Sequence, residues 1–133
     1  MKKTLSILCL SFIMLAVASC KKETIVQGNT NQTVYATNVS NWELTNDGGG
    51  SYVVDIPVSK LDKTYSEYGA VLVYITRPGG TEWEQIPEIY GGRAFSFTHD
   101  VGRVSIYAQN PTGTLTKPDP IDVKIVLIDS NVD

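Results

Sequence analysis

The sequence has very few of the residues that most catalytic and metal sites require. Among its 133 residues there are two cysteines and one histidine. Thiol nucleophiles, disulfide frameworks and zinc sites each need several such residues together. The formal net charge is −3 at pH 7, so the sequence also lacks the basic excess typical of nucleic-acid binding. This composition argues against metal, redox and thiol chemistry, and against nucleic acid as a partner.

Long hydrophobic runs are also missing, except near the N-terminus. Lys2 and Lys3 precede an almost uninterrupted apolar stretch over residues 5–18. A membrane-spanning helix needs about 20 apolar residues, so this stretch is typical of a secretory signal instead. It ends in Val17-Ala18-Ser19-Cys20, which resembles the lipobox of bacterial lipoproteins. We expect residues 1–19 to be a cleaved signal peptide and Cys20 to carry the lipid; the alternative is an ordinary signal peptide with an incidental cysteine.

Lipidation would remove every thiol from the mature protein. Cys9 leaves with the signal peptide and Cys20 becomes a thioether, so neither disulfides nor cysteine nucleophiles remain. Without Lys2 and Lys3, nine basic residues face 14 acidic ones, a net charge of −5. Anionic lipid repels such a surface, so we expect the acyl chains to hold the protein to its partner, the membrane. Two or more acyl chains are enough for a stable anchor.

Residues 20–32 read as the lipidated cysteine followed by a polar, flexible tether. Lys21-Lys22-Glu23 directly follows the cysteine, where lipoproteins of the Bacteroidetes carry a charged surface-export signal. That signal is richer in acid than this segment, so the match is partial. We expect an outer-membrane lipoprotein, with the surface and the periplasmic orientation both open.

Residues 33–129 predict a β-sandwich domain, followed by a short tail at 130–133. Breakers such as Pro78-Gly79-Gly80 and Gly91-Gly92 separate short runs in which apolar and polar residues alternate. The expected strands cover residues 33–39, 42–44, 52–56, 70–75, 82–86, 95–98, 104–109 and 125–128. Seven or eight short strands without a long helix indicate an all-β, antiparallel sandwich, with a closed barrel as the alternative.

Two segments depart from simple alternation. Residues 70–75 and 125–128 are apolar on both faces, which suits central strands covered on two sides or strands at an interface.

Residues 59–68 are the single helical segment expected, one or two turns long. Ser59 and Asp62 have the spacing of a capping box there.

The order of these segments resembles a family of small Bacteroidetes lipoproteins, whose modules also follow collagen-like repeats in larger proteins. The matching features are Thr33-Val34-Tyr35, Trp42, the 52–57 strand, Gly69-Ala70-Val71-Leu72-Val73-Tyr74, Trp83 with Ile86-Pro87, Phe95 and Phe97, Gly102 with Val104, and the 123–128 strand. The resemblance implies an immunoglobulin-like sandwich at the cell envelope. The family has no established activity, so no functional residue follows from it.

Tyrosine is frequent, with seven residues, and supplies large contact areas at recognition surfaces. Tyr65, Tyr68 and Tyr90 fall in or near predicted loops, which makes them the candidate ligand-binding residues. The remaining tyrosines fall in predicted strands, where tyrosine is common for structural reasons.

The acidic and histidine side chains offer weaker candidates. Glu82 and Glu84 would share one strand face, with Glu88 nearby. These residues are either an ordinary solvated face or the paired carboxylates of a glycosidase. His99 lacks the oriented nucleophile of a catalytic triad and reads as a strand-end residue. We therefore predict no catalytic residue.

The other candidates have structural explanations. Trp83 reads as a core anchor or an exposed stacking platform, and its position before Ile86-Pro87 favours the core, as for Trp42. Residues 46–50 lack the ligand spacing of a calcium loop and read as a hairpin turn. Asp119 and Asp122 are a weak cation possibility. We predict neither a metal nor a cofactor.

The leading hypothesis is a non-enzymatic envelope lipoprotein whose sandwich binds a protein or glycan ligand or has a structural role. The alternatives are a small carbohydrate-active enzyme and an accessory subunit of a surface assembly.

Overall fold

The computed structural model describes residues 31–131, apart from Asp47 and Gly49. The predicted signal peptide, Cys20 and nearly all of the tether lie outside the described residues, as do the last two residues of the tail. Lipidation and export therefore stay predictions.

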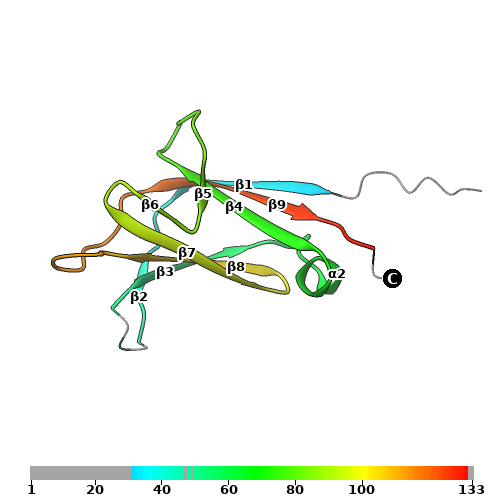
Figure 1. The fold of residues 1–133 in the computed structure, drawn as a ribbon, viewed down its shortest axis with the longest axis horizontal. Helices are drawn as coiled ribbons and strands as arrows, with labels where there is room; N and C mark the ends of the chain where they lie inside the picture. Colours follow the sequence, from blue (N-terminus) through cyan, green and yellow to red (C-terminus); the bar gives the residue numbers. More distant parts are fainter. Residues whose placement is uncertain (1–30, 47, 49, 132–133) are drawn as a thin grey trace, which may run out of the picture.

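Nine strands and one short helix make up the described part of the chain (Figure 1). They are β1 Gln32–Val39, β2 Glu43–Leu44, β3 Tyr52–Pro57, α2 Lys63–Glu67, β4 Ala70–Thr76, β5 Glu84–Ile86, β6 Glu88–Tyr90, β7 Arg93–Asp100, β8 Arg103–Gln109 and β9 Ile121–Ile128. All strand pairs are antiparallel. One sheet has the order β1-β9-β4-β5 and the other β2-β3-β8-β7-β6.

This architecture confirms the predicted antiparallel β-sandwich. The closed-barrel alternative is wrong, because the strands form two separate sheets with open edges at β1, β5, β2 and β6. Strand β6 was not predicted, since three residues between Pro87 and Gly91 are too short to show a period of two. The first half of the predicted 82–86 strand is instead part of a hairpin loop.

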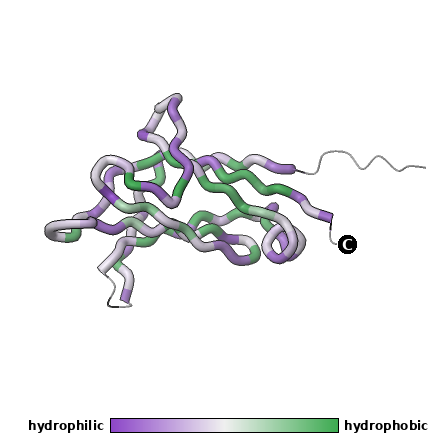
Figure 2. Tube along the Cα trace, viewed as in Figure 1, coloured by the Kyte–Doolittle hydropathy of each residue, from purple (hydrophilic) through white to green (hydrophobic). Residues whose placement is uncertain are grey.

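The core lies between the two sheets and follows the alternation of the strands (Figure 2). On β9, the side chains of Val123, Ile125 and Leu127 are completely buried, while their neighbours are half-exposed. The buried apolar set is Trp42, Val54, Ile56, Val58, Leu61, Val71, Val73, Ile75, Ile86, Phe95, Val104, Ile106, Ala108, Ile121, Val123, Ile125 and Leu127. The hydrophobic effect at this interface is the main stabilisation of the fold.

Strands β4 and β9 are neighbours in the middle of the four-stranded sheet, as their apolar sequences predict. Only one face of them is buried, however. Leu72, Val126 and Ile128 on the outer face are half-exposed among the described residues. The expectation that both faces are covered is therefore not met within the described part of the chain.

The helix α2 has five residues, and it begins three residues later than a cap at Ser59 would place it. Asp62 is the N-cap, and its Oδ1 accepts a hydrogen bond from the Tyr65 backbone N–H at 3.1 Å. The predicted capping box from Ser59 is wrong, because Asp62 takes the position that the box assigns to Ser59. No helix among the described residues has the length and apolar character needed to cross a membrane.

Candidate functional site

The loop that joins β4 to β5 forms one wall of the candidate site. Its first four residues make a tight turn, in which the Gly80 N–H donates to the Arg77 carbonyl at 2.8 Å. Pro78 and then Gly79, with φ of +72°, fit the two central positions of a type II turn. A Cβ on Gly80 would overlap the hydroxyl oxygen of Thr76, so the loop lies directly against the end of β4.

Two side chains from elsewhere in the fold hold this loop. Asp122, on β9, accepts a hydrogen bond from the Gly79 N–H at 2.9 Å through Oδ2. Its Oδ1 accepts from the Asn38 N–H on β1 at 2.7 Å. The Tyr90 hydroxyl accepts from the Arg77 N–H at 3.1 Å. Asp122 therefore has a structural role, and its two oxygens face backbone donors rather than a cation.

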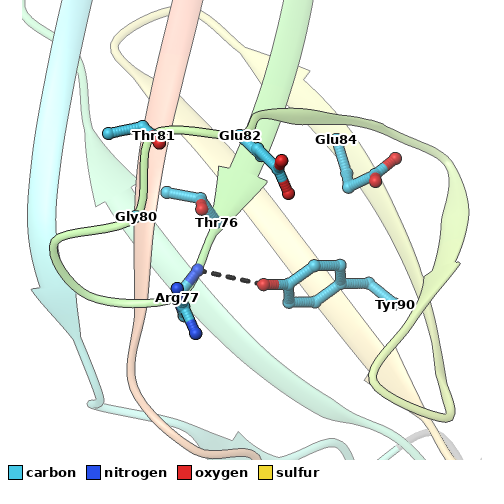
Figure 3. A pocket seen from close by; sticks show the side chains of 7 residues that line it. All are labelled: Thr76, Arg77, Gly80, Thr81, Glu82, Glu84 and Tyr90. Carbon is cyan, nitrogen blue, oxygen red and sulfur yellow. Dashed lines mark hydrogen bonds between the residues drawn. The ribbon is translucent and has the colours of Figure 1, made fainter.

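The fixed loop encloses a polar hollow of about 320 Å³ at one end of the sandwich (Figure 3). The residues that line it are Thr76, Arg77, Gly80, Thr81, Glu82, Glu84 and Tyr90. Within the described residues, the carboxylates of Glu82 and Glu84 and the guanidinium of Arg77 have no hydrogen-bond or ion-pair partner. Charged groups that line a concavity without protein partners are available to a ligand.

A second hollow of about 150 Å³ adjoins the first and shares Arg77 and Tyr90 with it. Its other side is the segment that leads into β9, which includes Pro118 and Asp119. Arg93 fixes this segment by donating to Asn110 Oδ1 and to Thr116 Oγ1, both at 2.8 Å. The two hollows thus have walls that side-chain hydrogen bonds hold in place.

Of the three predicted tyrosines, the structure places only Tyr90 at these hollows. Tyr90 lies at the end of strand β6 rather than in a loop, and its ring packs against Phe95 at a centroid distance of 6.5 Å. Tyr65 and Tyr68 belong to α2 and its C-cap, at the opposite end of the sandwich (Figure 1). Tyr65 packs against the core, and Tyr68 is 51% exposed.

Of the acidic candidates, too, only some lie at the polar hollow. Glu82 and Glu84 line the polar hollow together, and both are exposed. Glu88 lies outside it, and its Oε1 accepts from the backbone N–H of Ile89 at 2.9 Å. His99 lies at the far end of β7, where its Nδ1 is 3.4 Å from Ser66 Oγ on α2. Among residues 31–131 as described, no three histidine, cysteine or acidic side chains gather as a metal site.

The two tryptophans have different environments. Trp42 belongs to the core, with 4% of its surface exposed and its ring 6.2 Å from that of Phe95. Trp83 is half-buried on the outer face of the four-stranded sheet, 6.0 Å from the Tyr35 ring. The interpretation of Trp83 as a core anchor is therefore wrong. Its ring belongs to the outer face because Trp83 precedes β5 in phase with Gln85, whereas the inward position is Ile86.

Lys124 completes a cluster on that outer face. It is the cross-strand partner of both Tyr35 and Tyr74, and its Nζ lies 4.3 Å from the Tyr74 ring centroid and 4.9 Å from that of Trp83. We call Tyr35, Tyr74, Trp83 and Lys124 the sheet-face cluster. Sequence reasoning did not find it, because its members come from four separate segments of the chain.

Arg77 and Thr81 were also missed as site residues. They lie in a segment whose Pro-Gly-Gly motif indicates a turn and carries no signal of binding. Tyr90 is near this turn only because the fold brings strand β6 close to the end of β4.

Comparison of the chain with protein-family models, with curated proteins and with solved structures gave no match.

Proposed function

We propose that this chain is a lipid-anchored protein of the outer membrane whose sandwich domain is a non-enzymatic module that binds a glycan. The observation that carries the proposal is the polar hollow, where the carboxylates of Glu82 and Glu84 and the guanidinium of Arg77 have no partner among the described residues. Its volume of about 320 Å³ is at the small end of the range of ligand sites.

The chemistry of the hollow favours a sugar over an apolar ligand. Sugar hydroxyls donate to carboxylates and accept from guanidinium and hydroxyl donors, and each such bond to a charged group contributes about 1.5–3 kcal/mol. The Tyr90 ring adds an apolar surface for the carbon face of a sugar. The excess of acidic residues disfavours a polyanionic glycan, so the expected ligand is neutral.

The same two carboxylates motivate the alternative, a small carbohydrate-active enzyme. Glycoside hydrolysis needs two carboxyl groups in environments that differ, one of them shielded from water. Glu82 and Glu84 are both exposed and come from the same short segment. Their similar surroundings support binding over hydrolysis.

The strand order supports an immunoglobulin-like sandwich and the resemblance to the Bacteroidetes lipoproteins. The order β2-β3-β8-β7 corresponds to strands A, B, E and D of that fold, and β9-β4 corresponds to F and C. The place of strand G beside F is taken by β1, the first strand of the chain. We include this relationship in the proposal.

A glycan array with the full-length protein tests the proposal, followed by calorimetry on each glycan bound. We expect Glu82→Gln and Glu84→Gln to weaken binding at least tenfold. Glu88→Gln is the matched control, since Glu88 lies outside the hollow, and it should bind as the wild type does. Failure to bind any neutral glycan, or hydrolysis of a bound one that Glu82→Gln abolishes, would refute the proposal.

Protease treatment of intact cells decides the orientation. Loss of the protein from intact cells would assign the domain to the cell surface and a ligand outside the cell. Cleavage only after lysis would assign it to the periplasm, where glycans of the envelope would be the ligands to test.

A further inference from the structure

The sheet-face cluster and the polar hollow meet at one short segment of the chain, residues 82–84. Glu82 and Glu84 line the hollow, and Trp83, the residue between them, directs its ring over the outer face of the four-stranded sheet. The two features therefore share one short segment. Because successive side chains point to opposite sides, the hollow and the Trp83 ring lie on either side of this segment, next to the edge strand β5, and a ligand that reaches both would pass around that edge.

The rings of the cluster contact one another and the Lys124 ammonium in the absence of a ligand. The Lys124 ammonium lies over both the Tyr74 and the Trp83 rings, and the Tyr35 ring is tilted by 56° against that of Trp83. Cation–aromatic and aromatic pairs of this kind hold side chains in place. The cluster also keeps exposed ring surface, since Tyr35 is 61% exposed and Trp83 is half-buried.

Exposed aromatic rings on the outer face of a sheet suit the carbon face of a sugar ring. Burial of that face against an aromatic ring releases water from two apolar surfaces. Lys124 has no carboxylate partner among the described residues, so its remaining N–H groups can donate to sugar hydroxyls. The neighbouring Asp122 keeps its negative charge, but its oxygens accept two backbone N–H groups, and it forms no ion pair with Lys124 among the described residues.

We infer that the sheet-face cluster is a second subsite for the same glycan, so that the ligand is a neutral oligosaccharide chain rather than a single sugar. This inference rests on the proposed function, since the chain enters the polar hollow at one end and stacks on Trp83 and Tyr35 at the other. The affinity of the protein should therefore rise with the length of the chain.

The test uses full-length protein and neutral oligosaccharides in β-gluco, β-manno, β-xylo and α-gluco series, each from disaccharide to hexasaccharide. In at least one series, the wild type should bind the hexasaccharide more tightly than the disaccharide. Tyr35→Ala should weaken hexasaccharide binding about two- to tenfold and leave disaccharide binding unchanged. Tyr68→Ala removes a comparably exposed ring at the other end of the sandwich and should change neither.

Tryptophan fluorescence gives a second measurement that needs no substitution at the site. Acrylamide should quench Trp83 and leave the buried Trp42 largely unaffected. The hexasaccharide should protect Trp83 from quenching, and the disaccharide should not.

The outcomes separate this inference from the proposed function. If no series binds, the proposed function fails. If binding occurs but does not depend on length, or if Tyr35→Ala keeps the full length dependence, the second subsite is overturned while the polar hollow stands. If Tyr35→Ala instead changes the sedimentation mass of the protein, the cluster is a contact between copies of the chain, and the inference is also overturned.

Discussion

Tyr90 acts on its surroundings through two different parts of its side chain. The ring packs on Phe95 and against the core, and the hydroxyl accepts the backbone N–H of Arg77. Tyr90 also lines both hollows. Tyr90 therefore connects the core, the β4–β5 loop and both hollows. Its position in the sequence, next to a Gly-Gly turn, does not indicate this role in the geometry of the site.

Replacing Tyr90 by phenylalanine separates these two parts. The ring packing should survive, while the Arg77 N–H loses its acceptor, so we expect the free energy of unfolding to fall by about 0.5–1.5 kcal/mol. Glycan binding in the polar hollow should weaken as well, because the loop loses one of its attachments. Urea unfolding and calorimetry measure the two effects. Tyr68→Phe is the control, and an equal loss in both variants would contradict this role for Tyr90.

At the scale of the elements, the β4–β5 loop and strand β1 depend on one carboxylate of β9. Asp122 bonds to the Gly79 N–H in the loop and to the Asn38 N–H at the irregular end of β1. Asn38 has a φ of +53°, and the pairing of β1 with β9 shifts register between Ala36 and Val39. The carboxylate thus satisfies backbone donors at two points where the regular strand pattern ends.

Asp122→Asn tests this arrangement with almost no change in volume. Both oxygens of Asp122 face N–H donors, so the amide group of asparagine must point its own N–H₂ at one of them. We expect a loss of about 1–3 kcal/mol in the free energy of unfolding, measured by chemical denaturation. Asp119→Asn should be nearly neutral, because Asp119 is exposed. A neutral result for Asp122→Asn would mean that these hydrogen bonds contribute nothing to stability.

The close approach of the loop to β4 gives a second prediction at this scale. In Gly80→Ala, the new methyl group would overlap the hydroxyl of Thr76, which is 2% exposed, and would lie 2.9 Å from the Arg77 carbonyl oxygen. We expect a loss of about 1–3 kcal/mol from overpacking, seen as a lower melting temperature. Thr76→Ser combined with Gly80→Ala keeps the same hydroxyl overlap and should not rescue stability, whereas Thr76→Ala should rescue part of it.

At the scale of the whole molecule, the proposed site and the proposed anchor belong to separate segments of the chain. The described strands run from Gln32 to Ile128, and Cys20 precedes them by a polar segment. In the proposed lipoprotein, the membrane attachment would rely on the acyl chains alone, because the excess of acidic residues disfavours binding to anionic lipid.

Replacement of Cys20 by alanine should release the protein from the membrane. With no acyl chain to insert and no basic surface to hold anionic lipid, nearly all of the protein should move to the soluble fraction after cell fractionation. Its unfolding transition and its glycan binding should match those of the wild type. Retention of a Cys20→Ala variant that also lacks residues 1–19 would show a second means of attachment.

The sequence by itself determined the class of the fold and most of its strands. Alternating residues such as Val104, Ile106 and Ala108 predict which side of a strand is buried, because successive side chains of a strand point to opposite faces. The turn at Pro78-Gly79 was likewise visible, since the conformational preferences of proline and glycine are local. Very short strands such as β6, and the choice between Ser59 and Asp62 as the cap of α2, were beyond this local reasoning.

Only the tertiary structure decided which side chains meet. Glu82 and Tyr90 share a hollow because the chain crosses from one sheet to the other between β5 and β6. Tyr35, Tyr74 and Lys124 share a row because β9 pairs with both β1 and β4. The order of strands in a sheet is set by long-range packing of the buried faces, which no local pattern encodes. For the same reason, alternation could show that Trp83 and Gln85 share a face but not which face of the sheet is buried.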